Sequence, residues 1–522
     1  MFAVQLRWMS PLVLITGLGA SAGCVAMRAQ TTWRISQVEG VTPQTSAAGH
    51  TAPARVVLPL TPEERALARG ILQQLIEIDT SNPTGSTLPA VEAVRQRFLD
   101  AGFAAEDVAI VGPKDSRMNL VVRYRGDATS TEKPVLLMGH LDVVEAPRDE
   151  WTVEPFKLTE TDGYFYGRGT QDMKNSDAAW VTSFLTLKKA GWVPKRDMIL
   201  ALTADEEGGG DDGAEWLVKN RRLLVDAGFA VNPDAGGLLL SGGKPLELDL
   251  EETEKVYTDF VLTATNPGGH SSRPMPENAL YLVADALGRI ERSPFPVELN
   301  AVTRSYLEAE ARHESDEKKK LISKILKPKM DSDAAGQLSQ DPGYNAIMRT
   351  TCVATMMGAG EAENALPGKA SANVNCRILP GHSPEEVRKR LVQIVSDVRV
   401  KVQYRTEGGE LLDTAPEKTA MQPPPLTPEV MKPLRAVAQA MWPGLRIVPE
   451  MEAGSTDSVY TAAAGIPTYG FSGMGIDLND DRAHGRDERL RVESFYTGVQ
   501  FMREMVKEMG DEQDVAQGSA TK

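Results

Sequence analysis

The fold of this chain is decided by residues 135–142, which read Val-Leu-Leu-Met-Gly-His-Leu-Asp. Four apolar residues in succession are typical of a strand that is buried on both faces, as in a parallel sheet covered by helices. Two later apolar runs, at 198–202 and 229–231, are of the same kind, and segments with helical periodicity separate the three. This alternation predicts an α/β fold, with a mainly parallel sheet and helices on both of its faces.

A second domain is expected because 522 residues exceed what one hydrophobic core usually supports. From residue 255 the strand patterns become half polar. Strand, helix, strand, strand, helix and strand follow in that order over 255–410, which predicts an inserted ferredoxin-like α+β lid domain. The main domain then comprises residues 56–254 and 411–510, and a polar tail at 511–522 is expected to be disordered.

The N-terminus has the pattern of a secretory signal peptide. A basic residue precedes an apolar stretch and small residues, which predicts a signal peptide at 1–23 and a flexible linker at 24–55. The signal peptide ends in Ala-Gly before Cys24, as in a bacterial lipobox, where the cysteine would carry a lipid anchor. We therefore expect export across the inner membrane to the periplasm, as a soluble or a lipid-anchored protein.

Cys352 and Cys376 are too few for a disulfide framework. One bridge between them is conceivable in an oxidising compartment, but two buried thiols are the favoured interpretation. The net charge of −15 argues against a nucleic-acid partner. A charged stretch at 308–340 would either extend a dimer interface of the lid or block one, so both a monomer and a homodimer remain open.

Acidic and histidine residues follow the predicted strands, and one histidine lies far along the chain. The candidate metal ligands are His140, Asp172, Glu207, Asp234 and His484. Taken alone, each has an ordinary explanation, such as a helix cap for Asp172 or an Asx-turn for Asp234. Together they supply the carboxylates and imidazoles that two divalent ions sharing one bridging carboxylate require. The set points to a metallohydrolase.

The motifs around these residues resemble those of the di-zinc metallopeptidases of the ArgE/DapE/aminoacylase/carboxypeptidase type, in particular carboxypeptidase S-like and dipeptidase-like members. The resemblance covers about residues 62–507. It is carried by Gly-His-Leu-Asp-Val-Val at 139–144, Gly-Arg-Gly-Thr-Gln-Asp-Met-Lys at 167–174, Asp-Glu-Glu at 205–207 and Asn-Pro-Gly-Gly-His-Ser-Ser-Arg-Pro at 266–274.

This resemblance implies a ligand set. Asp172 would bridge two ions, His140 and Asp234 would complete one of them, and Glu207 and His484 the other. Many family members have Asn-Glu-Gly-Gly where this chain has Asn-Pro-Asp-Ala-Gly-Gly at 232–237, so the register of Asp234 departs from the common form. Zn²⁺ is the expected metal, with Co²⁺ or Mn²⁺ as alternatives.

The resemblance also implies catalytic and substrate-binding residues. Glu206 would be the general base toward a metal-activated water. Asp142 would accept a hydrogen bond from the imidazole of His140. His270 in the lid would stabilise the oxyanion, commonly from a partner subunit. The residues expected to hold a substrate carboxylate are Arg377, Asn364, Ser455 and Thr456, although Arg377 could instead form a surface salt bridge.

These features predict a secreted di-zinc exopeptidase, a dipeptidase or a carboxypeptidase, that hydrolyses an amide bond near a free carboxylate. An N-acyl-amino-acid amidohydrolase is the alternative, because no motif shows which side of the scissile bond is recognised. A catalytically silent metal- or peptide-binding lipoprotein is the second alternative, and the presence of both the base and the ligand candidates disfavours it.

Overall fold

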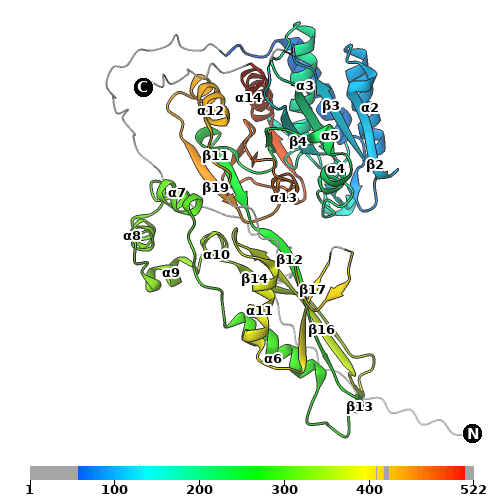
Figure 1. Cartoon of the computed structure of the whole chain (residues 1–522), viewed down its shortest axis with the longest axis vertical. Coiled ribbons are helices and arrows are strands. Elements are labelled where there is room, and N and C mark those ends of the chain that lie inside the picture. Colours follow the sequence, from blue (N-terminus) through cyan, green and yellow to red (C-terminus); the bar gives the residue numbers. More distant parts are fainter. Residues whose placement is uncertain (1–56, 129, 407, 417–422, 512–522) are drawn as a thin grey trace, which may run out of the picture.

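The computed structural model describes residues 57–128, 130–406, 408–416 and 423–511. Figure 1 shows a larger body above and an elongated lid below, joined where β11 (Lys244–Glu254) is followed by β12 (Val256–Thr265). The predicted signal peptide, Cys24 and the linker lie outside the described residues, as does the tail from residue 512. Within the described part of the chain, no helix has the length and apolar character needed to cross a membrane.

The main sheet contains the strand that ends in His140. Its six strands lie in the order β2 (Val108–Lys114), β3 (Arg117–Tyr124), β8 (Met198–Thr203), β4 (Val135–His140), β9 (Phe229–Val231) and β20 (Thr468–Tyr469). The pairs β8–β4, β4–β9 and β9–β20 are parallel, whereas β2–β3 and β3–β8 are antiparallel. All residues of β4 and β8 are buried. The mainly parallel sheet is therefore confirmed.

Helices cover both faces of this sheet, as predicted. One face packs against α1 (Pro62–Ile76), α2 (Leu88–Asp100), α3 (Lys174–Lys189), α12 (Pro428–Met441) and α14 (Val492–Gly510). The other face packs against α4 (Ala214–Asn220), α5 (Arg222–Val225) and α13 (Ser458–Ala463). Alternate strand residues enter the two cores: Leu137 and Leu200 lie in the first, Leu136 and Ile199 in the second.

Smaller sheets complete the main body. A four-stranded sheet has the order β19 (Ile447–Glu452), β11, β10 (Gly237–Ser241) and β21 (Gly475–Asp477). A three-stranded sheet has the order β22 (Arg489–Arg491), β7 (Tyr164–Tyr166) and β6 (Thr159–Thr161), and β1 (Ser81–Asn82) pairs with β5 (Val143–Val144). Short 3₁₀ turns lie at Ala105–Asp107 and Arg148–Glu150.

The lid has the predicted ferredoxin-like arrangement. Its sheet has the order β14 (Thr351–Ala359), β16 (Lys369–Ile378), β12, β17 (Val400–Arg405) and β18 (Leu411–Leu412), with every pair antiparallel. The helices α6 (Ala279–Glu291) and α11 (Pro384–Val395) share one apolar core with the sheet. A small two-stranded antiparallel sheet of β13 (Gly269–His270) and β15 (Ala365–Leu366) lies at the end far from the main body (Figure 1).

Cys352 and Cys376 form a disulfide, so the expectation of two thiols was wrong. The two residues are direct cross-strand partners on β14 and β16. Strand pairing brings them together, and the register depends on a bulge between Ala354 and Met356 that the sequence pattern does not reveal.

The charged stretch in the lid folds into helices that pack on the main body. The insertion contains α7 (Ala301–Glu310), α8 (Asp316–Ile325), α9 (Ser332–Leu338) and α10 (Pro342–Met348). Its core includes Tyr306 and Leu307 together with Val448 of β19. The insertion therefore connects the lid to the main body in addition to the β11–β12 connection (Figure 1).

Buried carboxylates crowd this contact. Glu310 of α7 lies close enough to Glu247 of β11 for the two charges to interact, and Arg446 donates a hydrogen bond to Glu247 over 3.1 Å. Burial, and then the charges of Glu247 and Glu314, raise the pKa of Glu310 to about 8. Burial and the charge of Glu452 likewise raise the pKa of Glu450 on β19 to about 8.

Glu310→Gln is expected to stabilise the protein at alkaline pH. A glutamate ionises near pH 4.3 in an unfolded chain, whereas Glu310 ionises near pH 8 in the folded one. The folded state keeps a proton that the unfolded state releases, so stability falls as pH rises through this window. The melting temperature of Glu310→Gln should exceed that of the parent at pH 8, and the difference should vanish near pH 4. A difference independent of pH would contradict the assignment.

Candidate active site at the edge of the main sheet

His140 ends β4 and is 1 % exposed. Its Nδ1 lies 2.9 Å from the main-chain oxygen of Asp142. Because a carbonyl oxygen can only accept, Nδ1 carries the proton in this contact. The lone pair of Nε2 is then left facing Oδ1 of Asp172 at 3.0 Å, which makes Nε2 the available ligand atom.

The Asp142 carboxylate was expected to accept a hydrogen bond from this imidazole. It does not, because it lies 3.7 Å from Nδ1 of His140. The carboxylate instead accepts the main-chain N–H groups of Glu206 and Glu207, each over 3.1 Å. It also accepts from Nδ2 of Asn82 over 3.0 Å. Asp142 therefore fixes the turn after β8 that carries both glutamates.

Asp172 lies on the loop before α3, and Glu488 holds this loop in place. The Glu488 carboxylate is fully buried and accepts the N–H groups of Gly169, Gln171 and Asp172 over 2.6 to 3.1 Å. It also forms an ion pair with Arg168 at 2.6 Å. Since Glu488 lies four residues after His484, these contacts join the loop to the segment of the last histidine.

His484 and Asp234 complete the cluster. Nε2 of His484 lies 2.8 Å from Oε1 of Glu207 and 2.9 Å from Oδ2 of Asp172. Oδ1 of Asp234 lies 3.5 Å from Nε2 of His140. His484 has a φ of 62°, a left-handed conformation that non-glycine residues seldom adopt and that is often found at functional sites.

The possible ligand atoms form three triplets, one of which consists of His140, Glu206 and Glu207. The other two, the ligand triplets of the predicted sets, share Asp172. His140, Asp172 and Asp234 form one of these two, and Asp172, Glu207 and His484 form the other; the ligand atoms of each lie within 4.8 Å of one another. These are the two sets assigned from the sequence. The coordination of ions by them remains a prediction.

The electrostatics of the cluster favour bound cations. Burial and the charges of Asp234 and Glu207 raise the pKa of Glu206 well above its usual value. Burial lowers the pKa of His484, but hydrogen bonds to Asp172 and Glu207 outweigh it and raise the pKa to about 9. Carboxylates crowded in this way repel one another unless positive charge is supplied, and dications would supply it.

The loop that carries Ser455 and Thr456 lies beside the cluster, since the charge of the adjacent Asp457 interacts with those of His140 and Asp234. Thr456 is 8 % exposed; its N–H donates to Glu254 over 2.7 Å and its hydroxyl accepts from Asn232 over 3.2 Å. These contacts give Thr456 a role in holding the loop. Ser455 is partly exposed and remains the residue of the pair that can contact a substrate.

The lid residues of the prediction are widely separated. His270 lies on β13 at the far end of the lid (Figure 1), and Asn364 accompanies it, since its main-chain oxygen accepts from Ser271 over 2.9 Å. Arg377 lies near the opposite end of the lid sheet, where its guanidinium stacks on Tyr257 at 4.7 Å. Within one chain, neither His270 nor Asn364 lies near the metal-ligand candidates.

Sequence reasoning missed three supporting residues: Asn82, Glu488 and Asp457. Asn82 donates to both Asp142 and Asp205. Asp457 accepts from Thr203 over 2.6 Å, and burial raises its pKa to about 7. Asp457 directly follows Ser455 and Thr456, which were predicted to contact the substrate, so its neighbourhood had been singled out. No local pattern marks Asn82 or Glu488, whose partners lie tens to hundreds of residues away.

Known proteins with similar sequences include the following two. N-fatty-acyl-amino acid synthase/hydrolase PM20D1 of Homo sapiens is 28 % identical over 487 residues, which are 89 % of this chain and 92 % of that protein. Probable carboxypeptidase S-like 2 of Dictyostelium discoideum is 29 % identical over 401 residues, 74 % of each chain.

The fold is also found in solved structures. The M20 family metallo-carboxypeptidase Sso-CP2 from Sulfolobus solfataricus superposes with a TM-score of 0.62 at 18 % identity, covering 85 % of this chain and 99 % of that one. The sequence model of peptidase family M20/M25/M40 matches residues 136–508, which include all five candidate ligands and the entire lid. This chain belongs to peptidase family M20/M25/M40.

Proposed function

We propose that this protein is a dinuclear metal-dependent exopeptidase that hydrolyses an amide bond next to a free carboxylate. The observation that carries the proposal is the pair of ligand triplets that share Asp172, with Glu206 beside them. Zinc is the proposed metal, because histidine with carboxylate oxygens suits it, and cobalt or manganese would also fit.

Each residue has a defined task in this mechanism. Bound ions would polarise the scissile carbonyl and lower the pKa of a water. Glu206 takes the proton of that water and passes it to the leaving nitrogen. Burial suits Glu206 to this task, because it raises the pKa of the carboxyl group above its usual value and so makes the carboxylate a better proton acceptor. The Asp142 carboxylate keeps Glu206 in place by accepting a hydrogen bond from the main-chain N–H of Glu206.

Two candidate substrate classes differ in the acyl group that is joined to the C-terminal amino acid. The carboxypeptidase S-like relative favours a peptide. The human relative, which covers more of the chain, favours an N-fatty-acyl amino acid as a second candidate. Turnover of the metal-loaded protein on dipeptides and on N-acyl derivatives of the same C-terminal amino acid separates them. The proposal predicts release of the free amino acid from at least one class, and release from neither would favour the silent metal-binding alternative.

We propose further that His270 acts on the site of a second copy. Its place at the far end of the lid keeps it from the cluster of its own chain (Figure 1). The edge strand β14 supports association, because it exposes Val353 and Met356 by 61 % and 66 %, and an apolar edge strand invites pairing. A pair of copies related by a two-fold axis would cover both edges.

Mixing two inactive variants tests this arrangement. We expect His270→Ala and Glu206→Ala each to be nearly inactive alone. A mixed dimer has one site with Glu206 from one copy and His270 from the other, so activity should return on mixing after subunit exchange. The absence of recovery, with both variants dimeric, would show that His270 does not act across subunits.

We propose that the protein is exported, with the signal peptide removed or Cys24 lipidated. The Cys352–Cys376 disulfide supports an oxidising compartment such as the periplasm. Fractionation of cells that produce the full chain, compared with Cys24→Ser, tests export and lipidation separately.

A further inference from the structure

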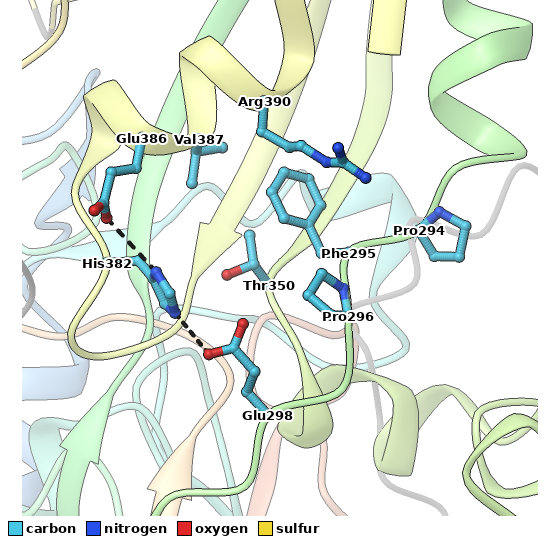
Figure 2. A pocket seen from close by; sticks show the side chains of 9 residues that line it. All are labelled: Pro294, Phe295, Pro296, Glu298, Thr350, His382, Glu386, Val387 and Arg390. Atoms are coloured by element: carbon cyan, nitrogen blue, oxygen red, sulfur yellow. Dashed lines mark hydrogen bonds and ion pairs between the residues drawn. The ribbon is translucent and has the colours of Figure 1, made fainter. Parts of the chain in front are cut away.

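A cavity of about 390 Å³ lies in the lid, apart from the metal-ligand cluster. Its volume is within the range of small-ligand sites, which is ~300–1,000 Å³. It lies between α11 and the two segments that connect the helical insertion to the lid sheet. Its lining residues are Pro294, Phe295, Pro296, Glu298, Thr350, His382, Glu386, Val387 and Arg390 (Figure 2).

The cavity offers both signs of charge. Nε2 of His382 contacts Glu298 at 2.9 Å, and its Nδ1 lies 3.6 Å from Glu386. One oxygen of Glu298 makes the histidine contact, and the other has no hydrogen-bond partner among the described residues. The side chain of Arg390 is exposed and forms no ion pair or hydrogen bond within the described part of the chain. One anion and one cation are thus available to a ligand.

Apolar surface separates these charges. In Figure 2, Arg390 lies at one end of the cavity and Glu298 at the other, with Phe295 and Pro296 between them. A simple anion would meet the two glutamates, and a simple cation would meet Arg390. A free α-amino acid carries its ammonium and its carboxylate on the same carbon atom, so it would present both charges at one end of the cavity. The ligand that fits has an ammonium and a carboxylate at opposite ends of a partly apolar body.

We propose that this cavity binds a short unmodified peptide, of which a dipeptide is the simplest form. The C-terminal carboxylate pairs with Arg390 in a two-point contact, and the N-terminal ammonium pairs with Glu298. Side chains of the peptide pack on Phe295, Pro296 and Val387. This site is separate from the proposed metal-dependent activity and rests on the cavity alone.

The surroundings indicate what the peptide would connect. The N–H of Glu298 donates to the main-chain oxygen of Met348 over 2.9 Å, and Arg349 donates to that of Phe295 over 3.0 Å. The segments entering and leaving the insertion are therefore bound side by side. A peptide in the cavity would contact both segments and α11, and so would link the lid to the insertion that packs on β19.

Calorimetric titration of the metal-loaded Glu206→Ala protein with the dipeptide Ala-Phe tests the proposal, because this variant prevents turnover. Adding Arg390→Ala to this protein should abolish binding of the dipeptide at the cavity site or weaken it at least tenfold. Adding Glu298→Gln should have the same effect. Adding Arg435→Ala, which removes an exposed arginine of α12, should change nothing. N-acetyl-phenylalanine, which lacks the ammonium, should not bind in the cavity. Unchanged titrations in either cavity variant would overturn the proposal.

Hydrogen exchange provides an independent measurement. Peptide should slow exchange at 295–299 and 382–390 in the parent and in Arg435→Ala, and not in Arg390→Ala. The cavity residues substituted here are exposed, so equal melting temperatures will show that the variants are folded. These binding measurements test the cavity site whether or not the protein hydrolyses peptides. If peptide slows exchange only near the metal-ligand cluster and not at 295–299 and 382–390, the cavity site is overturned.

Discussion

Asp172→Ala is expected to lose both metal ions and to reduce turnover by at least about 10³-fold. Asp172 is the one residue shared by the two ligand triplets. Metal ions contribute several kcal/mol of charge stabilisation in the transition state, and about 4 kcal/mol corresponds to 10³-fold in rate. Elemental analysis of the purified protein, combined with turnover on the best substrate of the panel, measures both effects.

His484→Ala provides the matched comparison for this prediction. His484 belongs to only one triplet, so its loss should remove about one ion per chain and leave the other. Asp115→Ala, on the exposed turn between β2 and β3, should keep both ions and full activity. Retention of both ions in Asp172→Ala would contradict the shared-ligand assignment, as would equal metal loss in the two site variants.

Glu206→Gln is expected to lower turnover by roughly 10²–10⁴-fold, the usual contribution of a general base, without loss of metal. The amide has nearly the same size but cannot take a proton at neutral pH. Its backbone N–H still donates to Asp142, so the turn should keep its shape.

The metal content distinguishes a base from a ligand. Glu206→Gln should bind as much metal as the parent, whereas Glu207→Gln should bind less. Glu106→Gln, an exposed glutamate of the same domain, should behave as the parent does. Undiminished turnover in Glu206→Gln would refute the mechanism, and loss of an ion would instead place Glu206 among the ligands.

The fold was largely predictable because its signals are local. Apolar runs such as 198–202 are followed within a few residues by acidic residues, and parallel strands bring their carboxyl ends to the same edge of a sheet. The order of strands and helices in the lid was likewise readable from periodicity. The disulfide was not, because a bulge sets the register of Cys352 against Cys376.

The candidate ligand residues of the site could be predicted from the sequence, but the residues that hold their loops in place could not. The family resemblance implied that Asp142 accepts a hydrogen bond from the imidazole of His140. In the structure the backbone turns so that the main-chain oxygen of Asp142 faces the ring, and the carboxylate reaches the next loop. Asn82 and Glu488 act on residues that are distant in sequence, and no spacing rule connects such pairs.

The sequence by itself determined the family, the two-domain organisation and the set of candidate ligands, since residue type and short-range pattern limit all three. Only the tertiary structure decided which carboxylate supports which loop, and that His270 lies far from the cluster of its own chain. It also decided that the charged insertion packs on β19. Hydrogen bonds and ion pairs form between atoms within a few ångströms of each other, and in this chain the packing of the sheets and lid sets those distances.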